Sequence, residues 1–220
     1  MKLHIYIFRH GQTCFNRDHI FTGWKDSQLT PKGKSQARLI ANKLRNKKFQ
    51  VAYHTRLSRS KDTLKPSLKL HPECKEVIVD DRMIERSYGK FEGKHHSTIV
   101  EKEGEDSYKT LLHWHKIDHL RGKEREAFVK KVGEAELHII RRSYDVRPPG
   151  GESVKDVEKR VNAFIKDLLK KMKKEKVSVA ISAHGNSMRP FRRYFEKFSY
   201  ERMMELENPW DDFFHYTVDV

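Results

Sequence analysis

Two short apolar runs, far apart in the chain, each end in a histidine followed by a glycine. The first run precedes His10 and Gly11, and the second precedes His184 and Gly185. Both runs are nearly uninterrupted and rich in β-branched or aromatic residues, as are strands buried in a parallel sheet. Ligands of such sheets bind beyond the carboxyl ends of the strands. If the two strands are neighbours, both imidazoles therefore meet at one site.

Strands and helices are predicted to alternate along most of the chain. Strands are predicted at 3–8, 49–53, 77–79 and 177–182, with a last edge strand at 213–218. Helices are predicted from Pro31 with Thr30 as the cap, around 57–68, over 154–172 behind a capping box of Ser153 and Asp156, and around Pro190. Pro66 would kink the second helix or end it early. This alternation predicts an α/β fold, a three-layer sandwich whose mostly parallel central sheet is flanked by helices.

Residues 94–140 differ from the rest because they are polar and rich in Lys, Glu and His. They are predicted to form a helical insertion in a single domain that spans 1–220. Its apolar seam is expected at Leu111, Leu112, Trp114, Ile117, Leu120 and Phe128. The insertion holds His113, His115 and His119, with His95 and His96 before them. No carboxylate or cysteine accompanies them in a known metal-binding spacing, so solvated imidazoles are expected and no metal.

Lysine and arginine outnumber the acidic residues and give the chain a formal net charge of +15. A field of this sign attracts nucleic acid, acidic membrane surfaces or phosphorylated metabolites. The chain has no apolar run of membrane-spanning length, and its N-terminus lacks the small-residue cleavage site of a signal peptide. Cys14 and Cys74 cannot build a disulfide framework, so a reduced, cytoplasmic setting is expected.

Arginines accompany the histidines at the predicted sheet edge. Arg9, directly before His10, offers a planar fork that suits a phosphate group. Arg59 follows a predicted strand at the start of a helix, where backbone N–H groups also favour anions. One His-Gly pair alone would be typical of a strand-ending turn. Two such pairs with two arginines favour phosphoryl transfer through a histidine, which needs a nucleophile and charge neutralisation but no metal.

A series of motifs in a fixed order adds a family resemblance. The motifs are 8–13 (FRHGQT) with Asn16, 21–24 (FTGW), 29–33 (LTPKG), 85–89 (ERSYG), 133–136 (GEAE), 141–149 (RRSYDVRPP), 182–189 (SAHGNSMR) and 205–209 (ELENP). In this order they resemble the histidine phosphatase superfamily, and most closely its cofactor-dependent (2,3-bisphosphoglycerate-dependent) phosphoglycerate mutases. The resemblance covers nearly the whole chain except residues 97–131.

The resemblance implies a role for each residue that matches a catalytic motif. His10 would be the nucleophile that carries the phosphoryl group. Arg9, Arg59 and His184 would surround that group and stabilise its charge in the transition state. Glu85 would donate and accept the proton of the substrate hydroxyl.

A substrate pocket is also implied by the resemblance, lined by Asn16, Thr22, Gly23, Tyr88, Gly185 and Asn186. Arg141 and Arg142 would grip the carboxylate and the second phosphate of a phosphoglycerate. Ungapped alignment places His96 where the family has a substrate-binding lysine, and Lys94 lies close by in the sequence. Either Lys94 takes over that contact or the phosphate is held less tightly.

Two further departures from the family bear on the reaction. The additional residues between Gly93 and Arg141 would form a helical lid or flank near the pocket mouth. The family's C-terminal glycine-bearing segment and tail are replaced by residues 209–220. A covering tail keeps water away from a phosphohistidine, so its replacement would favour hydrolysis unless the insertion covers the pocket instead.

The expected activity is that of a phosphoglycerate mutase, an isomerase of glycolysis and gluconeogenesis. It would interconvert 3-phosphoglycerate and 2-phosphoglycerate, with 2,3-bisphosphoglycerate as the primer of His10. The alternative is a phosphatase that hydrolyses a small phosphorylated metabolite at the same site. A nucleic-acid-binding protein on an inactive enzyme fold is disfavoured, because no aromatic–basic stacking platform is found. The expected partner is therefore a small anionic phosphorylated substrate rather than a membrane or nucleic acid, and a homo-oligomer is left open.

Overall fold

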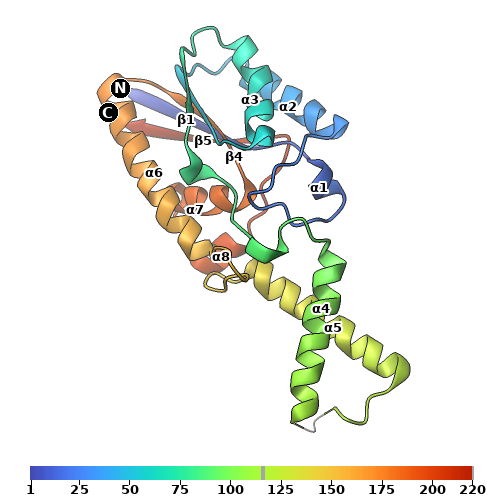
Figure 1. Cartoon of the computed structure of the whole chain (residues 1–220). Helices are drawn as coiled ribbons and strands as arrows, with labels where there is room; N and C mark the ends of the chain where they lie inside the picture. The colour runs from blue at the N-terminus through green and yellow to red at the C-terminus, as the bar shows by residue number, and fades with distance from the viewer. Residues whose placement is uncertain (115–116, 220) are drawn as a thin grey trace.

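Five strands form one sheet in the order β3-β2-β4-β1-β5 in the computed structural model, which describes residues 1–114 and 117–219 (Figure 1). The strands are β1 (Lys2–Arg9), β2 (Val51–His54), β3 (Glu76–Val79), β4 (Val179–Ala183) and β5 (Phe213–Asp219). The first four pair in parallel, and β5 lies antiparallel beside β1 at the edge. The predicted sheet with its C-terminal edge strand is confirmed, although β2 begins at Val51 rather than at Phe49.

Helices occupy much of the remaining described chain. They are α1 (Cys14–Arg17), α2 (Pro31–Leu44), α3 (Ser58–Leu70), α4 (His96–His113), α5 (Gly122–Arg142), α6 (Val154–Glu175), α7 (Gly185–Glu196), α8 (Tyr200–Glu205) and the short 3-10 helices η1 (Asp81–Met83) and η2 (Gly89–Phe91). Thr30 caps α2 with its side chain, and Ser153 and Asp156 form the capping box of α6, as predicted. None of the helices described is both long and apolar enough to cross a membrane.

The helix α3 corrects one prediction. Pro66 lies inside it, and the helix continues to Leu70, so the expectation of an early end at Pro66 is wrong. Leu64 and Leu68 on the same helix pack into the apolar cluster that α2 and α3 form with the sheet. This tertiary packing outweighs the backbone hydrogen bond that a proline cannot make.

The two faces of the sheet bury alternate residues of β1. Tyr6 and Phe8 belong to the cluster beneath α2 and α3, whereas Ile5 and Ile7 belong to the larger cluster beneath α6 and α7. Successive side chains of a strand point to opposite faces, so β1 must be covered on both sides. The result is the predicted three-layer sandwich, with helices on both faces of the sheet (Figure 1).

The predicted insertion forms a hairpin of α4 and α5 that projects from the body of the molecule (Figure 1). The two helices approach closely at Gly133, where a Cβ atom would meet the carbonyl oxygen of Val100 at 1.9 Å. The hairpin has its own apolar cluster, made by Tyr108, Ile117 and Val129 with half-buried Leu111, Leu112, Leu120 and Phe128. Trp114 does not belong to this seam, because α4 ends before it and its side chain is 67% exposed in the turn. His115 lies outside the described residues.

Candidate active site

The parallel pairing of β1 with β4 brings the two histidines together. Arg9 and Ala183 are in register, so the next residue of each strand leaves the sheet at the same edge. The backbone N–H of His10 donates to the carbonyl of Ala183 at 3.0 Å. The imidazole rings of His10 and His184 are buried, and their centroids lie 5.0 Å apart.

The hydrogen bond of His10 fixes which ring nitrogen carries the proton. Nδ1 lies 2.8 Å from the carbonyl oxygen of Gly11. A carbonyl can only accept, so Nδ1 carries the hydrogen and Nε2 keeps its lone pair. The loop is held in place because the N–H of Gly11 donates to Thr63 Oγ1 at 3.0 Å, and a side chain at Gly11 would meet the Gly33 carbonyl oxygen at 2.4 Å. His10 is therefore oriented for attack through Nε2.

Three buried nitrogen atoms around the histidines have no hydrogen-bond partner among the described residues. They are Arg9 Nε, Arg59 Nε and His184 Nδ1. Arg59 is otherwise tightly held, because its terminal nitrogens donate to the carbonyls of Gly23 at 2.8 Å and Lys25 at 2.9 Å. Buried polar groups are normally satisfied. Oxygen atoms of a phosphoryl group could accept hydrogen bonds from these nitrogens.

Both imidazoles are held in their neutral form. Burial lowers the pKa of His10 well below 6.5, and the nearby charges of Arg59 and Arg9 add to the shift. Burial and Arg59 likewise lower the pKa of His184. Burial also lowers the pKa of Arg59, to about 10, so that this side chain stays a cation at neutral pH. The site thus combines two neutral imidazoles with fixed positive charge.

A pH profile should report this environment. Because the pKa of His10 is lowered, its neutral form persists as the pH falls through 6.5, the ordinary value for histidine. We expect kcat/KM for transfer of a phosphoryl group to His10, corrected for ionisation of the substrate phosphate, to stay level as the pH falls from about 8 through 6.5 and to decline only at lower pH. A fall centred near pH 6.5 would mean that His10 titrates like an exposed histidine and would contradict this electrostatic environment.

Glu85 lies beside the two histidines. One ligand atom each from His10, Glu85 and His184 lies within 4.8 Å of the others. Glu85 is 8% exposed, and its Oε1 accepts from the backbone N–H groups of Arg86 at 2.8 Å and Asn186 at 3.1 Å. These bonds leave Oε2 available to hold or release a proton.

A cavity of about 310 Å³ opens next to this group. It is lined by most of the residues predicted from the sequence: Arg9, Asn16, Thr22, Gly23, Glu85, Tyr88, His96, Arg141, Arg142, Gly185 and Asn186. Glu85 is part of the lining. His10 and His184 are not, but they are buried beside Glu85. The lining therefore gathers several cationic side chains, among them Arg9, Arg141 and Arg142, in one cavity.

Lys94 is not brought to the cavity. Its side chain is exposed and does not contribute to the described lining, whereas His96 does. The backbone carbonyl of Lys94 accepts from the N–H of Phe21 at 3.0 Å. Burial and the charge of Arg141 lower the pKa of His96 to about 4, so His96 is neutral at the position where the resemblance implies a lysine. The cationic side chains in this part of the lining are therefore Arg141 and Arg142.

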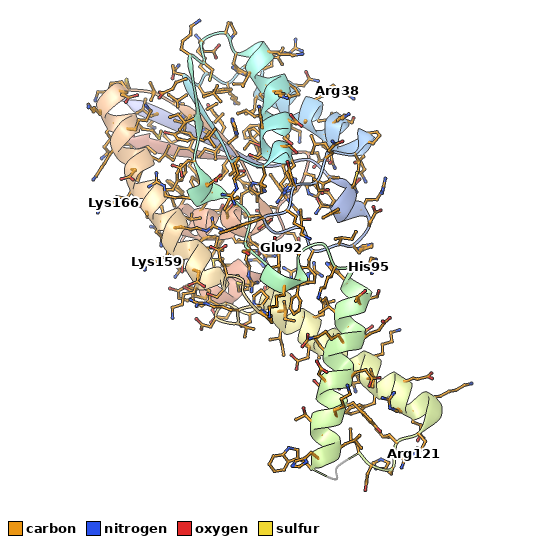
Figure 2. The ribbon with its side chains drawn as sticks, viewed as in Figure 1. Arg38, Glu92, His95, Arg121, Lys159 and Lys166 are labelled. Atoms are coloured by element: carbon orange, nitrogen blue, oxygen red, sulfur yellow. The ribbon has the colours of Figure 1, made fainter. Side chains whose placement is uncertain are left out.

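Of the two arrangements expected for the insertion, a lid or a flank near the pocket mouth, the described residues fit the flank. The hairpin contributes only His96, Arg141 and Arg142 to the described lining, all at its base. Figure 2 shows His95 at that base and Arg121 near the far end, away from the sheet. Among the residues that sequence reasoning missed, fully buried Arg86 anchors the base, because it donates to the Ile140 carbonyl at 2.8 Å.

The C-terminal loop lines the cavity with residues that were not among the predicted site residues: Leu206, Glu207, Asn208 and Trp210. The indole of Trp210 stacks on the guanidinium of Arg9 at 4.6 Å, and the carbonyl of Asn208 accepts from Arg9 Nη1 at 3.2 Å. Arg189 also lines the cavity and donates to Asn186 Oδ1 at 3.0 Å. Its spacing of one helical turn from Asn186 could have predicted its position. The 205–209 motif of the family resemblance contains residues 206–208 but implied no role for them.

A family model and individual relatives of similar sequence point to the same protein family. The model of the histidine phosphatase superfamily (branch 1) matches residues 5–143 and 116–211. A 2,3-bisphosphoglycerate-dependent phosphoglycerate mutase of Parvibaculum lavamentivorans is 34% identical over 204 residues, which cover 91% of this chain and 83% of that protein. A protein of the same name from Methanococcus vannielii is 31% identical over 204 residues, with 91% and 84% covered.

Solved structures that share the fold carry the names of different enzymes. A mycobacterial glucosyl-3-phosphoglycerate phosphatase has a TM-score of 0.71 at 20% identity and covers 99% of this chain and 91% of its own. A phosphoglycerate mutase from Bacillus anthracis has a TM-score of 0.65 at 22% identity, with 89% and 81% covered. A phosphatase and a mutase are thus built on the same architecture, so the fold alone does not separate the two reactions.

Proposed function

Because the chain belongs to the histidine phosphatase superfamily, we propose that it transfers phosphoryl groups through His10 and acts as a 2,3-bisphosphoglycerate-dependent phosphoglycerate mutase. The observation that carries the proposal is the neutral imidazole of His10, with Nε2 free, beside the cations Arg9 and Arg59. The relatives that carry the mutase name support the choice of reaction. Such a role belongs to central carbon metabolism in the cytoplasm, where Cys14 and Cys74 would stay reduced.

In the primed enzyme, His10 carries a phosphoryl group on Nε2. Glu85 takes the proton from the 2-hydroxyl of 3-phosphoglycerate, whose oxygen attacks phosphorus while the bond to His10 breaks. The resulting 2,3-bisphosphoglycerate turns in the cavity and presents its 3-phosphoryl group to Nε2. Glu85 then protonates the departing oxygen, so that 2-phosphoglycerate leaves and His10 is phosphorylated again. Arg9, Arg59 and His184 would donate hydrogen bonds to the phosphoryl oxygens throughout.

The residues of the cavity suit a ligand with two anionic ends. The unpartnered nitrogens of Arg9, Arg59 and His184 fit one phosphoryl group. Arg141 and Arg142 line the same cavity and fit a carboxylate or a second phosphate. 2,3-Bisphosphoglycerate, which would supply the first phosphoryl group, carries both kinds of anion.

Hydrolysis at the same site is the second candidate. Residues 206–210 border one side of the cavity, but the chain turns away into β5 at Phe213 and pairs with β1. Among its described residues, the hairpin adds no cover to the cavity beyond its base. Water that reaches the phosphohistidine would replace the substrate hydroxyl as acceptor, and the enzyme would then release phosphate.

Product analysis separates the two candidates. Purified protein is incubated with 3-phosphoglycerate and a trace of 2,3-bisphosphoglycerate, and 2-phosphoglycerate and inorganic phosphate are measured in the same samples. The mutase proposal expects 2-phosphoglycerate to form much faster than phosphate and expects the primer to accelerate it. Release of phosphate without 2-phosphoglycerate would overturn the mutase in favour of the phosphatase.

A further inference from the structure

A carboxylate of the chain itself lies in the cavity beside Arg142, one of the two arginines proposed to grip the substrate's carboxylate. Glu207 lines the cavity, and its Oε1 accepts a hydrogen bond from Nη2 of Arg142. The other terminal nitrogen of Arg142 donates to the carbonyl of Met204 at 3.1 Å. Both terminal nitrogens of the guanidinium are thus already engaged by the chain itself. A substrate carboxylate that approaches Arg142 must therefore compete with Glu207 for the N–H groups of this guanidinium.

Glu207 remains an anion under ordinary conditions. Burial alone would raise its pKa, but the hydrogen bond from Arg142 and the charges of Arg142, Arg189 and Arg9 lower it below the usual value. Its negative charge therefore acts on any ligand in the cavity at neutral pH. A second carboxylate in the same place would meet both this repulsion and the loss of the Arg142 contact.

The backbone keeps Glu207 at the cavity, while its side chain can move. The residue before it, Leu206, accepts from Arg189 Nε at 3.1 Å, and buried Asn208 donates to the Gly185 carbonyl at 2.9 Å. The Glu207 side chain itself is 71% exposed. Exposed ion pairs are weak, so a strongly anionic ligand can displace it by rotation into solvent. A ligand with a hydroxyl group there could instead donate a hydrogen bond to the carboxylate in place.

We propose that Glu207 sets the substrate preference of this cavity by competing with the substrate's carboxylate for Arg142. The proposal rests on the proposed phosphoryl-transfer function and adds the chemical class of substrate that the cavity selects. Glu207 weakens the binding of phosphate esters that carry a carboxylate relative to those that carry a hydroxyl group, so 3-phosphoglycerate binds less tightly than it would without this charge. It is a specificity-determining residue, because its carboxylate is bonded to Arg142, whereas the proposed nucleophile is His10 and the proposed proton donor is Glu85.

The test compares two ligands that differ only in whether they carry a carboxylate or a hydroxyl group at this place. 3-Phosphoglycerate has a carboxylate where glycerol 3-phosphate has a CH₂OH group. Dissociation constants for both are measured by calorimetry on the full chain, its E207Q variant and the control E205Q. Glu205 is exposed in the same segment but does not line the cavity, so its variant controls for loss of one negative charge. We expect E207Q to raise the preference for 3-phosphoglycerate over glycerol 3-phosphate about tenfold, and E205Q to leave the ratio unchanged.

Binding is measured rather than turnover, so that the two proposals fail separately. If E207Q lowers the dissociation constants of both ligands by the same factor, or leaves both unchanged, the ratio of the two constants stays the same. Glu207 then does not select the ligand, and the inference is wrong even if the protein is an active mutase. If the ratio shifts but no 2-phosphoglycerate forms in the product assay, the inference stands and the mutase proposal fails. If neither ligand binds the wild-type chain, both are overturned.

Discussion

Replacing His10 with alanine is expected to lower the turnover of 3-phosphoglycerate, and of any other phosphate ester that the protein accepts, by about ten-thousandfold or more. The reason is that Nε2 of His10 is the proposed nucleophile, and its neighbour His184 cannot replace it. Nε2 of His184 is already bound to Thr55 Oγ1 at 2.8 Å, and its Nδ1 is buried. Steady-state assays of isomerisation and of phosphate release measure the loss.

A matched control distinguishes lost chemistry from lost packing. His71 is as buried as His10, at 2% exposed, but it ends α3 and its Nδ1 pairs with Glu73. H71N should keep the turnover per folded molecule, with folding followed by circular dichroism. An H10A protein that folds and keeps more than about one hundredth of the wild-type turnover would show that another group attacks phosphorus.

The E85Q variant is expected to lose about a thousandfold in turnover of 3-phosphoglycerate, because a glutamine cannot protonate the departing alkoxide oxygen. The substitution keeps an acceptor oxygen for the N–H groups of Arg86 and Asn186, so the local backbone should be preserved. p-Nitrophenyl phosphate has a leaving group that needs no proton. Its cleavage, followed as release of nitrophenolate, should fall by less than about tenfold in the same variant.

The comparison between the two esters distinguishes loss of the proton donor from a change of structure. A change of structure at Glu85 would slow both reactions alike, whereas loss of an acid slows only the one that needs it. Equal losses for 3-phosphoglycerate and p-nitrophenyl phosphate would therefore remove Glu85 from its role as the proton donor and leave it a positioning residue.

Sequence reasoning works where short-range rules decide the structure. The apolar runs before His10 and His184 predicted two buried parallel strands, and their pairing in register follows from the sheet. The caps at Thr30 and Ser153 are local hydrogen-bond patterns, and the structure bears them out. Because strand ends fix where a side chain leaves the sheet, the meeting of His10 and His184 could be predicted from the two strands, whereas Glu85 was implied only by the family resemblance.

Features that depend on long-range packing could not be predicted from the sequence. The direction of the α4–α5 hairpin is set by contacts such as that of Arg86 with the Ile140 carbonyl, across residues far apart in the sequence. Trp114 fits a helical apolar pattern, but α4 ends before it, so its side chain lies exposed. Glu207 and Trp210 reach the cavity through a loop with no periodicity to interpret. Glu207 also lies among basic side chains in a cavity where charge alone would lead one to expect only cations and neutral groups.

The covalent state of His10 is the most direct test of phosphoryl transfer. Wild-type protein is mixed with 2,3-bisphosphoglycerate, quenched at alkaline pH where phosphohistidine survives, digested and analysed by mass spectrometry. The proposed chemistry predicts one acid-labile phosphoryl group per chain, located on His10 and discharged when 3-phosphoglycerate is added. A chain that stays unmodified, or that carries the phosphoryl group on another residue, would contradict it.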